Sequence, residues 1–207
     1  MRLSWSKFEI PHGFLCEIPI HLIYRVKGCA PVGELKKITD ELKDQLAILR
    51  TLKEDKRERY QHFMKEHFKV YDALLDAQDQ RKYVLANDVA AKIVIDSWLH
   101  LQEKGEIVLY AVCVMGNHVH VMLRGPDGVE DKSIGLLLRR HKTFTNTAIK
   151  EALNLSDNVW DTGFYDRYVR PGSFYAVLEY LLDNPKSAGL VQDWKAWPNT
   201  YVDERCL

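Results

Sequence analysis

The stretch IVLYAVCVMGNHVHVML, residues 107–123, decides how this chain folds. Its first nine residues are almost continuously apolar, which is the pattern of a β-strand covered on both faces. Gly116 and Asn117 follow as turn-forming residues, and residues 118–123 form a second predicted strand. Two strands joined by so short a turn pair as an antiparallel hairpin. The sequence therefore predicts a buried hairpin near the middle of the chain.

Two histidines, His118 and His120, lie in the second strand of this hairpin. Side chains alternate along a strand, so both imidazoles project from one face while Val119 and Val121 project from the other. Two histidines at this spacing can share one divalent ion. The alternative is a pair of surface or hydrogen-bonded histidines. The tight turn before them and the buried strand beside them provide a rigid mounting, which favours a metal site.

A second group of candidate residues lies on a predicted helix over residues 173–184, with Ser173 as N-cap and Pro185 ending it. Tyr180 and Asn184 are one turn apart and about 40° apart around the helix. Asn184 offers an amide oxygen for Mg²⁺ or Mn²⁺, and Tyr180 offers a phenol that could act as a nucleophile. Taken alone, Tyr180 is also explained as an aromatic residue at the core edge. The apolar face expected to dock on the sheet comprises Phe174, Leu178, Leu181 and Leu182.

The remaining segments complete one predicted domain spanning residues 1–207. The sequence predicts a strand at 16–27, helical structure at 34–80, a helix from 86 or 87 to about 100, a helix starting at 133, and a loop at 154–168. The charged residues 53–59 are either a bend between two helices or the exposed part of one long helix.

Bulk composition narrows the class of protein. The chain has 29 basic and 29 acidic residues, so a nucleic-acid ligand would need a local basic patch rather than an overall surplus. The four cysteines form no CxxC pair, which argues against a zinc ribbon or a disulfide framework. No apolar stretch reaches the roughly 18 residues of a membrane span, and no signal-peptide core is visible. We expect a reduced, cytoplasmic environment.

Two motifs in this order resemble a known family. Residues 114–123 resemble the HUH strand of single-tyrosine transposases, and residues 177–191 resemble the nucleophile helix and following turn of REP-associated tyrosine transposases. Three shorter matches lie in the expected order, at Arg25-Val26-Lys27-Gly28, Leu74-Leu75-Asp76 and Trp160-Asp161-Thr162-Gly163-Phe164-Tyr165-Asp166-Arg167. The resemblance covers roughly residues 14–198.

The resemblance implies a fold, a cofactor and a reaction. The fold is α+β, a ferredoxin-like antiparallel sheet with helices packed on it. The cofactor is Mg²⁺ or Mn²⁺, held by His118, His120 and Asn184. The reaction is cleavage and rejoining of hairpin-forming, REP-like single-stranded DNA, in which Tyr180 becomes joined to a 5′-phosphate. Two alternatives remain: a catalytically silent transposase that binds structured single-stranded DNA, and a metallohydrolase unrelated to DNA that would leave Tyr180 unused.

Candidate DNA contacts follow from charge and aromaticity. The basic candidates are Arg139, Arg140, Lys142, Arg167 and Arg170, and the possible stacking surfaces are Trp160, Phe164 and Tyr165. Lys142 lies where the family often has a lysine, which suggests phosphate contact or active-site electrostatics. The competing interpretation is a solvated helix face and a packed loop.

Two features depart from the family pattern. Gly116 stands where the family usually has proline, so the turn before His118 loses a φ restraint. A charged helical insertion at about residues 34–70 follows the first strand, and it could serve DNA binding or self-association. The sequence leaves open whether the protein is a monomer or a homodimer that exchanges the tyrosine helix.

Overall fold

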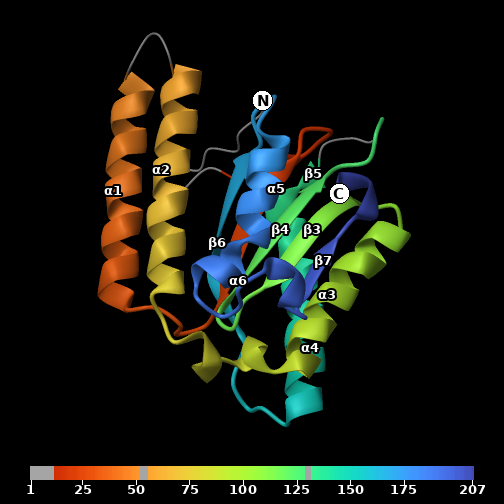
Figure 1. The fold of residues 1–207 in the computed structure, drawn as a ribbon. Helices are drawn as coiled ribbons and strands as arrows, with labels where there is room; N and C mark the ends of the chain where they lie inside the picture. The colour runs from red at the N-terminus through yellow and green to blue at the C-terminus, as the bar shows by residue number, and fades with distance from the viewer. Residues whose placement is uncertain (1–11, 52–55, 129–131) are drawn as a thin grey trace.

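The computed structural model describes residues 12–51, 56–128 and 132–207, and its centre is a five-stranded antiparallel sheet (Figure 1). The strands are β2 (Ile20–Val26), β3 (Val108–Val114), β4 (His118–Arg124), β6 (Trp160–Tyr168) and β7 (Thr200–Val202), in the order β6-β2-β4-β3-β7. The short strands β1 (Phe14–Leu15) and β5 (Lys132–Ser133) pair separately. The predicted hairpin is confirmed as β3–β4.

Helices cover both faces of this sheet. The helices are α1 (Val32–Thr51), α2 (Lys56–Asp76), α3 (Asp88–Glu103), α4 (Ile134–Leu153), α5 (Phe174–Leu182) and α6 (Asn184–Ser187). Helices α3 and α4 pack together on one face, and α5 packs on β3 and β4 from the other. The succession β2-α3-β3-β4-α4-β6, with spatial order β6-β2-β4-β3, is a ferredoxin-like fold, as expected. Among the described helices, none is both long and apolar enough to cross a membrane.

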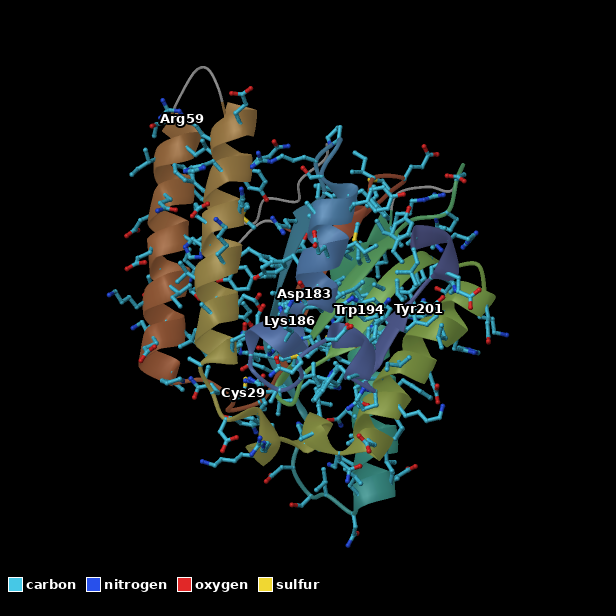
Figure 2. All side chains as sticks on the ribbon, viewed as in Figure 1. Cys29, Arg59, Asp183, Lys186, Trp194 and Tyr201 are labelled. Atoms are coloured by element: carbon cyan, nitrogen blue, oxygen red, sulfur yellow. The ribbon has the colours of Figure 1, made fainter. Side chains whose placement is uncertain are left out.

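The insertion after the first strand is a helical hairpin, α1–α2, that stands beside β6 (Figure 1). Helices α1 and α2 are separate and pack against each other, which decides for two helices rather than one long helix; residues 52–55 lie outside the described part. In Figure 2, Arg59 lies near the far end of the pair and Cys29 near its base. The last turns of α2 reach the sheet, where the Tyr71 ring packs against Tyr165 at 4.2 Å between centroids.

The predicted loop at 154–168 is wrong over most of its length, because residues 160–168 form the edge strand β6. The sequence did not predict a strand here because glycine and aspartate, as at Gly163, are depleted in strands. The strand is stabilised by backbone hydrogen bonds to β2, a pairing that cannot be derived from these residues alone. Trp160 and Tyr165 are buried, and the Trp160 indole donates to Thr145 Oγ1 at 2.9 Å. These two rings are therefore core residues and offer no stacking surface for bases.

The tyrosine helix also ends earlier than predicted. Helix α5 stops at Leu182, and Asn184 begins the short helix α6, whose first turn accommodates Pro185 because no intrahelical donor is needed there. Ser173 occupies the N-cap position but its side chain makes no capping hydrogen bond. The predicted docking face is confirmed, since Leu178, Leu181 and Leu182 are buried against β3 and β4. Tyr180 and Asn184 thus lie on two successive helices.

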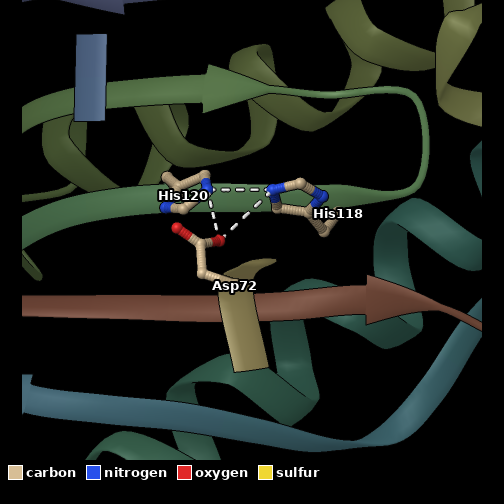
Figure 3. A group of neighbouring side chains, drawn as sticks. All are labelled: Asp72, His118 and His120. Atoms are coloured by element: carbon tan, nitrogen blue, oxygen red, sulfur yellow. Dashed lines mark hydrogen bonds and ion pairs between the residues drawn. The ribbon is translucent and has the colours of Figure 1, made fainter. Parts of the chain in front are cut away.

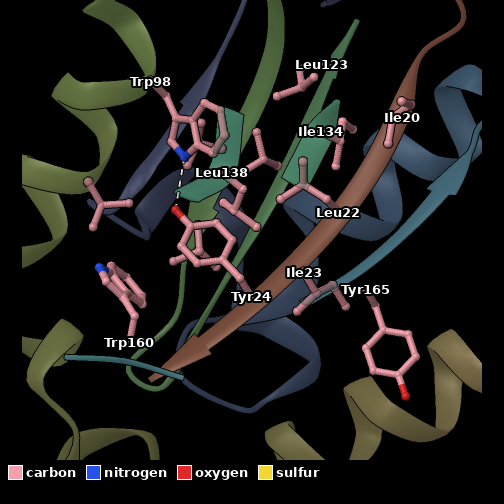
Figure 4. Close-up of a cluster of buried hydrophobic side chains, with 14 of the residues drawn as sticks. Ile20, Leu22, Ile23, Tyr24, Trp98, Leu123, Ile134, Leu138, Trp160 and Tyr165 are labelled. Atoms are coloured by element: carbon pink, nitrogen blue, oxygen red, sulfur yellow. Dashed lines mark hydrogen bonds between the residues drawn. The ribbon is translucent and has the colours of Figure 1, made fainter. Parts of the chain in front are cut away.

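The core on the other face of the sheet contains a buried hydrogen-bond chain. Trp98 Nε1 donates to the Tyr24 hydroxyl at 3.0 Å, within the cluster drawn in Figure 4. The Tyr24 hydroxyl lies 2.7 Å from His141 Nε2, and His141 Nδ1 lies 2.9 Å from Ser97 Oγ. The polar groups are therefore satisfied inside an apolar layer, and they tie β2 to α3 and α4.

Candidate metal centre

Both histidines of β4 are fully buried on the sheet face that carries α5. Their Nε2 atoms lie 2.9 Å apart, so the two rings converge on one point (Figure 3). Val119 and Val121 belong to the core cluster of the opposite face, as strand alternation predicts. The pairing of β4 between β2 and β3 fixes this arrangement.

The Nδ1 atom of each ring has a hydrogen-bond partner on the outer side of the ring. Asn117 Nδ2 donates to the Leu75 carbonyl at 2.8 Å, so Asn117 Oδ1 faces His118 Nδ1 at 2.6 Å and accepts a hydrogen bond from its N–H. His120 Nδ1 lies 3.1 Å from Nε2 of His21 on β2. A proton on each Nδ1 leaves both Nε2 lone pairs directed at the shared point, as in metal sites whose ligands are oriented by outer partners.

A carboxylate that sequence reasoning missed completes the group. Asp72, on α2, places Oδ1 3.2 Å from His120 Nε2 and 3.6 Å from His118 Nε2, and it is 1% exposed (Figure 3). Asp76, one helical turn later, lies 3.7 Å from His118 Nε2 through its Oδ1. The sequence signal was available: two aspartates at i and i+4 share one helix face. What the sequence could not show is that this face meets β4.

These residues fit a divalent ion. Adjacent ligand atoms that share one ion at about 2.1 Å lie about 3 Å apart, and the nitrogen and oxygen atoms here have such separations. Asp72 Oδ1, Asp76 Oδ1 and Asn184 Oδ1 are buried and accept no hydrogen bond within the described part of the chain. Buried acceptors without donors are costly unless a cation or water satisfies them. Two imidazoles with nearby carboxylate and amide oxygens suit an ion that accepts both nitrogen and oxygen.

Burial and mutual charge set the protonation of the group. Burial lowers the pKa of His118 to about 3, and His120 acts in the same direction, so His118 is neutral at physiological pH. Burial alone would raise the pKa of Asp72, but the neighbouring histidines and the Tyr180 hydroxyl hold it well below its usual range. Burial and the Asp72 charge raise the pKa of Asp76 to about 7. The centre therefore offers the neutral imidazole of His118 and at least one carboxylate.

The predicted nucleophile lies beside this group. The Tyr180 hydroxyl donates a hydrogen bond to Asp72 Oδ2, the oxygen opposite the one that faces the histidines. Burial, followed by the Asp72 charge, raises the pKa of Tyr180 far above its ordinary value. The Asn184 amide raises the pKa of His118, which places it near that ring. The structure thus brings Tyr180 and the histidine pair together around Asp72, with Asn184 near His118.

The predicted DNA contacts divide between two regions. Arg167 and Arg170 line a cleft that also includes Tyr180. Arg139 and Lys142 line a separate groove of about 850 Å³ between α1, β6 and α4. Arg140 is held by both carboxylate oxygens of Glu106, at 2.8 and 3.0 Å.

Lys142 has no place in the active-site electrostatics. Its Nζ donates to the carbonyl oxygens of Asp161 and Gly163 on β6, at 2.9 and 3.0 Å, so it braces α4 against the edge strand. Burial lowers the pKa of Lys142 to about 8. The expectation that Lys142 serves the active site is corrected, because α4 packs on the opposite face of the sheet from Tyr180.

Comparison with known proteins finds solved structures that resemble this chain, but no matching family model and no matching curated sequence. A REP-associated tyrosine transposase solved bound to a REP hairpin is similar over 93% of this chain and 81% of that one, with 13% identity and a TM-score of 0.49. A Deinococcus radiodurans R1 protein assigned as a transposase is similar over 85% of this chain and 97% of that one, with 15% identity and a TM-score of 0.34.

Proposed function

We propose that this protein is a metal-dependent endonuclease and strand transferase that acts on hairpin-forming single-stranded DNA through a 5′-phosphotyrosine intermediate. One observation carries the proposal. The two oxygens of the buried Asp72 face the His118–His120 pair and the Tyr180 hydroxyl respectively. A hydrolase that used only the histidines would have no need of a tyrosine in contact with the same carboxylate.

The residues divide the chemistry between them. Tyr180 Oη forms a bond to phosphorus while the bond from phosphorus to the 3′ oxygen breaks. The phenol proton is lost to solvent, while the hydrogen bond to Asp72 Oδ2 orients the hydroxyl, and the 3′ oxygen takes a proton from solvent and leaves as a free hydroxyl. A Mg²⁺ or Mn²⁺ ion held by His118, His120 and Asp72, with Asn184 at hand, would polarise the phosphate and favour the phenolate. The phosphotyrosine ester keeps the free energy of the broken phosphodiester bond. Attack by a 3′-hydroxyl on this ester therefore restores the DNA strand and releases Tyr180.

A covalent-adduct assay tests this function. Protein is incubated with Mn²⁺ and a pool of fluorescent single-stranded oligonucleotides that fold into hairpins with randomised flanks, and the mixture is resolved on a denaturing protein gel. We expect a fluorescent protein band that disappears with chelator and with Tyr180→Phe. The matched control is Tyr175→Phe, which alters an exposed tyrosine on the same helix and keeps the band.

Two results would reject the proposal. An adduct that persists in Tyr180→Phe would assign the nucleophile elsewhere. Specific hairpin binding without any adduct would identify the protein as a catalytically silent DNA-binding transposase.

A further inference from the structure

A cleft of about 240 Å³ lies between α2 and the segment that joins β6 to α5, and Tyr180 forms part of its wall. Helix α2 contributes Tyr60, Met64, Lys65, Phe68 and Lys69, and the opposite wall contains residues 166–170 together with Ser173, Ala176 and Val177. The α1–α2 insertion therefore supplies one wall of a cleft that ends at the proposed nucleophile.

Basic side chains gather at this cleft. Lys65 and Lys69 come from α2, and Arg167 and Arg170 come from the opposite wall. Among the described residues that line it, Asp166 has the single carboxylate, and that group is already engaged by His12 Nδ1 at 2.5 Å and the Gly13 amide at 2.7 Å. Lys69 forms an ion pair with Glu66 at 3.3 Å, so Lys65, Arg167 and Arg170 supply most of the positive charge of the cleft.

Arg167 connects the cleft with the metal centre. Its guanidinium lies 4.4 Å from the centre of the Phe68 ring, a cation–π contact that fixes the side chain across the cleft. Its Nε is buried and has no hydrogen-bond partner within the described residues. Arg167 and Tyr180 line the same cleft. A buried donor near the nucleophile is suited to an anionic ligand.

We propose that this cleft binds the unpaired DNA strand that flanks the scissile phosphate, with Arg167 and Arg170 on one side and Lys65 on the other contacting its phosphates. This inference rests on the proposed function of Tyr180. At about 240 Å³ the cleft is smaller than the roughly 300–1,000 Å³ typical of pockets for drug-sized ligands, which favours a narrow single strand over a duplex. The helical insertion is thus part of the substrate site.

Binding of a labelled, unstructured oligothymidylate tests the charge argument without catalysis. Fluorescence anisotropy is recorded in chelator over a series of salt concentrations for the wild type and the double variant Lys65→Glu, Arg170→Glu. We expect at least about tenfold weaker binding, and a salt dependence that is shallower by about 0.7 for each phosphate that the variant no longer neutralises. The matched control, Lys36→Glu with Lys104→Glu, makes the same charge change at exposed positions outside the cleft and keeps wild-type affinity. Equal affinity of the two double variants would overturn the proposal.

Photo-crosslinking locates the strand directly. An oligonucleotide that contains 5-bromodeoxyuridine is irradiated on the protein, and the modified peptides are identified by mass spectrometry. We expect crosslinks within residues 60–69 and 166–177. Crosslinks confined to the groove between α1, β6 and α4 would place the strand there instead and reject the cleft. This result can be distinguished from a failure of the proposed function. Crosslinks in the cleft without any covalent tyrosine adduct would reject the enzymatic activity but support the cleft as a DNA-binding site.

Discussion

Asp72 is the residue through which the proposed metal centre and the nucleophile are connected. One oxygen lies within 3.6 Å of both histidine Nε2 atoms, and the other accepts the hydrogen bond of Tyr180. Asn at this position keeps the shape of the side chain but removes its charge. We expect Asp72→Asn to weaken Mn²⁺ binding by about 10–100-fold, the range typical of changes around metal ligands.

Isothermal titration of Mn²⁺ into the protein measures this effect. Asp157→Asn is the matched control, because Asp157 is exposed and lies far along the sequence from the centre. Unchanged Mn²⁺ affinity in Asp72→Asn would show that the carboxylate only orients Tyr180 and is no ligand.

Gly116 forms the turn before His118, and close packing restrains it in place of a proline ring. A Cβ atom at this position would lie 1.9 Å from the carbonyl oxygen of Gln80. We expect Gly116→Ala to lower the free energy of unfolding by about 1–3 kcal/mol, as overpacking does. Urea unfolding measures it, with Gly33→Ala as control because nothing lies within 4 Å of a Cβ there. Equal stability of the two variants would show that the Gln80 segment moves aside.

Local geometry explains which site residues the sequence could predict. Strand alternation placed His118 and His120 on one face. The predicted spacing of one helical turn brought Tyr180 and Asn184 together, although Asn184 begins α6 and is not part of α5. The sequence could not predict that Asp72 and His21 belong to the site, because their approach to the centre depends on how α2 and β2 pack against β4. No spacing rule within a single element contains that information.

At the scale of elements, α2 has two roles that its sequence pattern concealed. The pattern predicted helical structure to about residue 80, and α2 does continue to Asp76. It assigned only residues 34–70 to an insertion, however, and did not show that the last turns of α2 reach the candidate metal centre. Strand β6 was missed for a related reason, since an edge strand with a glycine shows little alternation until its partner is known. The long apolar strand β3 and the capped helix α3 were predictable, because their signals are contained in their own residues. The Asn87 side chain does cap α3, accepting from the Val89 amide at 2.9 Å.

The contact between α3, β2 and α4 predicts a pH dependence of stability. Burial lowers the pKa of His141 to about 3 in the folded protein, whereas an unfolded histidine titrates near 6.5. Below pH 6.5 the unfolded chain binds a proton that the folded protein refuses, so stability is lost as the pH falls towards 3. This group alone should cost about 2 kcal/mol at pH 5 relative to pH 7.5.

Urea unfolding of the metal-free protein at both pH values measures this dependence, and His141→Gln is the comparison. The variant lacks the titrating group, so its stability should fall less between pH 7.5 and 5. The other histidines are common to both proteins and cancel in the difference. An equal fall in the two proteins would mean that His141 is protonated in the folded state.

At the scale of the whole molecule, zero net charge conceals an uneven distribution. Arg167, Arg170 and the lysines of α2 gather at the cleft beside Tyr180, while the separate groove across β6 contains Arg139 and Lys142. The sheet separates the two faces, with the metal centre on one and the α3–α4 core on the other. A single strand entering the cleft would reach the nucleophile and the histidine pair in succession.

The most direct test of this account is to identify the residue that carries DNA after reaction with Mn²⁺. The adduct is purified from the hairpin pool and digested with a protease and a nuclease, and the peptide that retains a nucleotide is sequenced by mass spectrometry. The account predicts a nucleotide 5′-phosphate on Tyr180, formed with Mn²⁺ and absent when His118 and His120 are replaced by alanine. A nucleotide on the exposed Tyr175, or on any other residue, would contradict it.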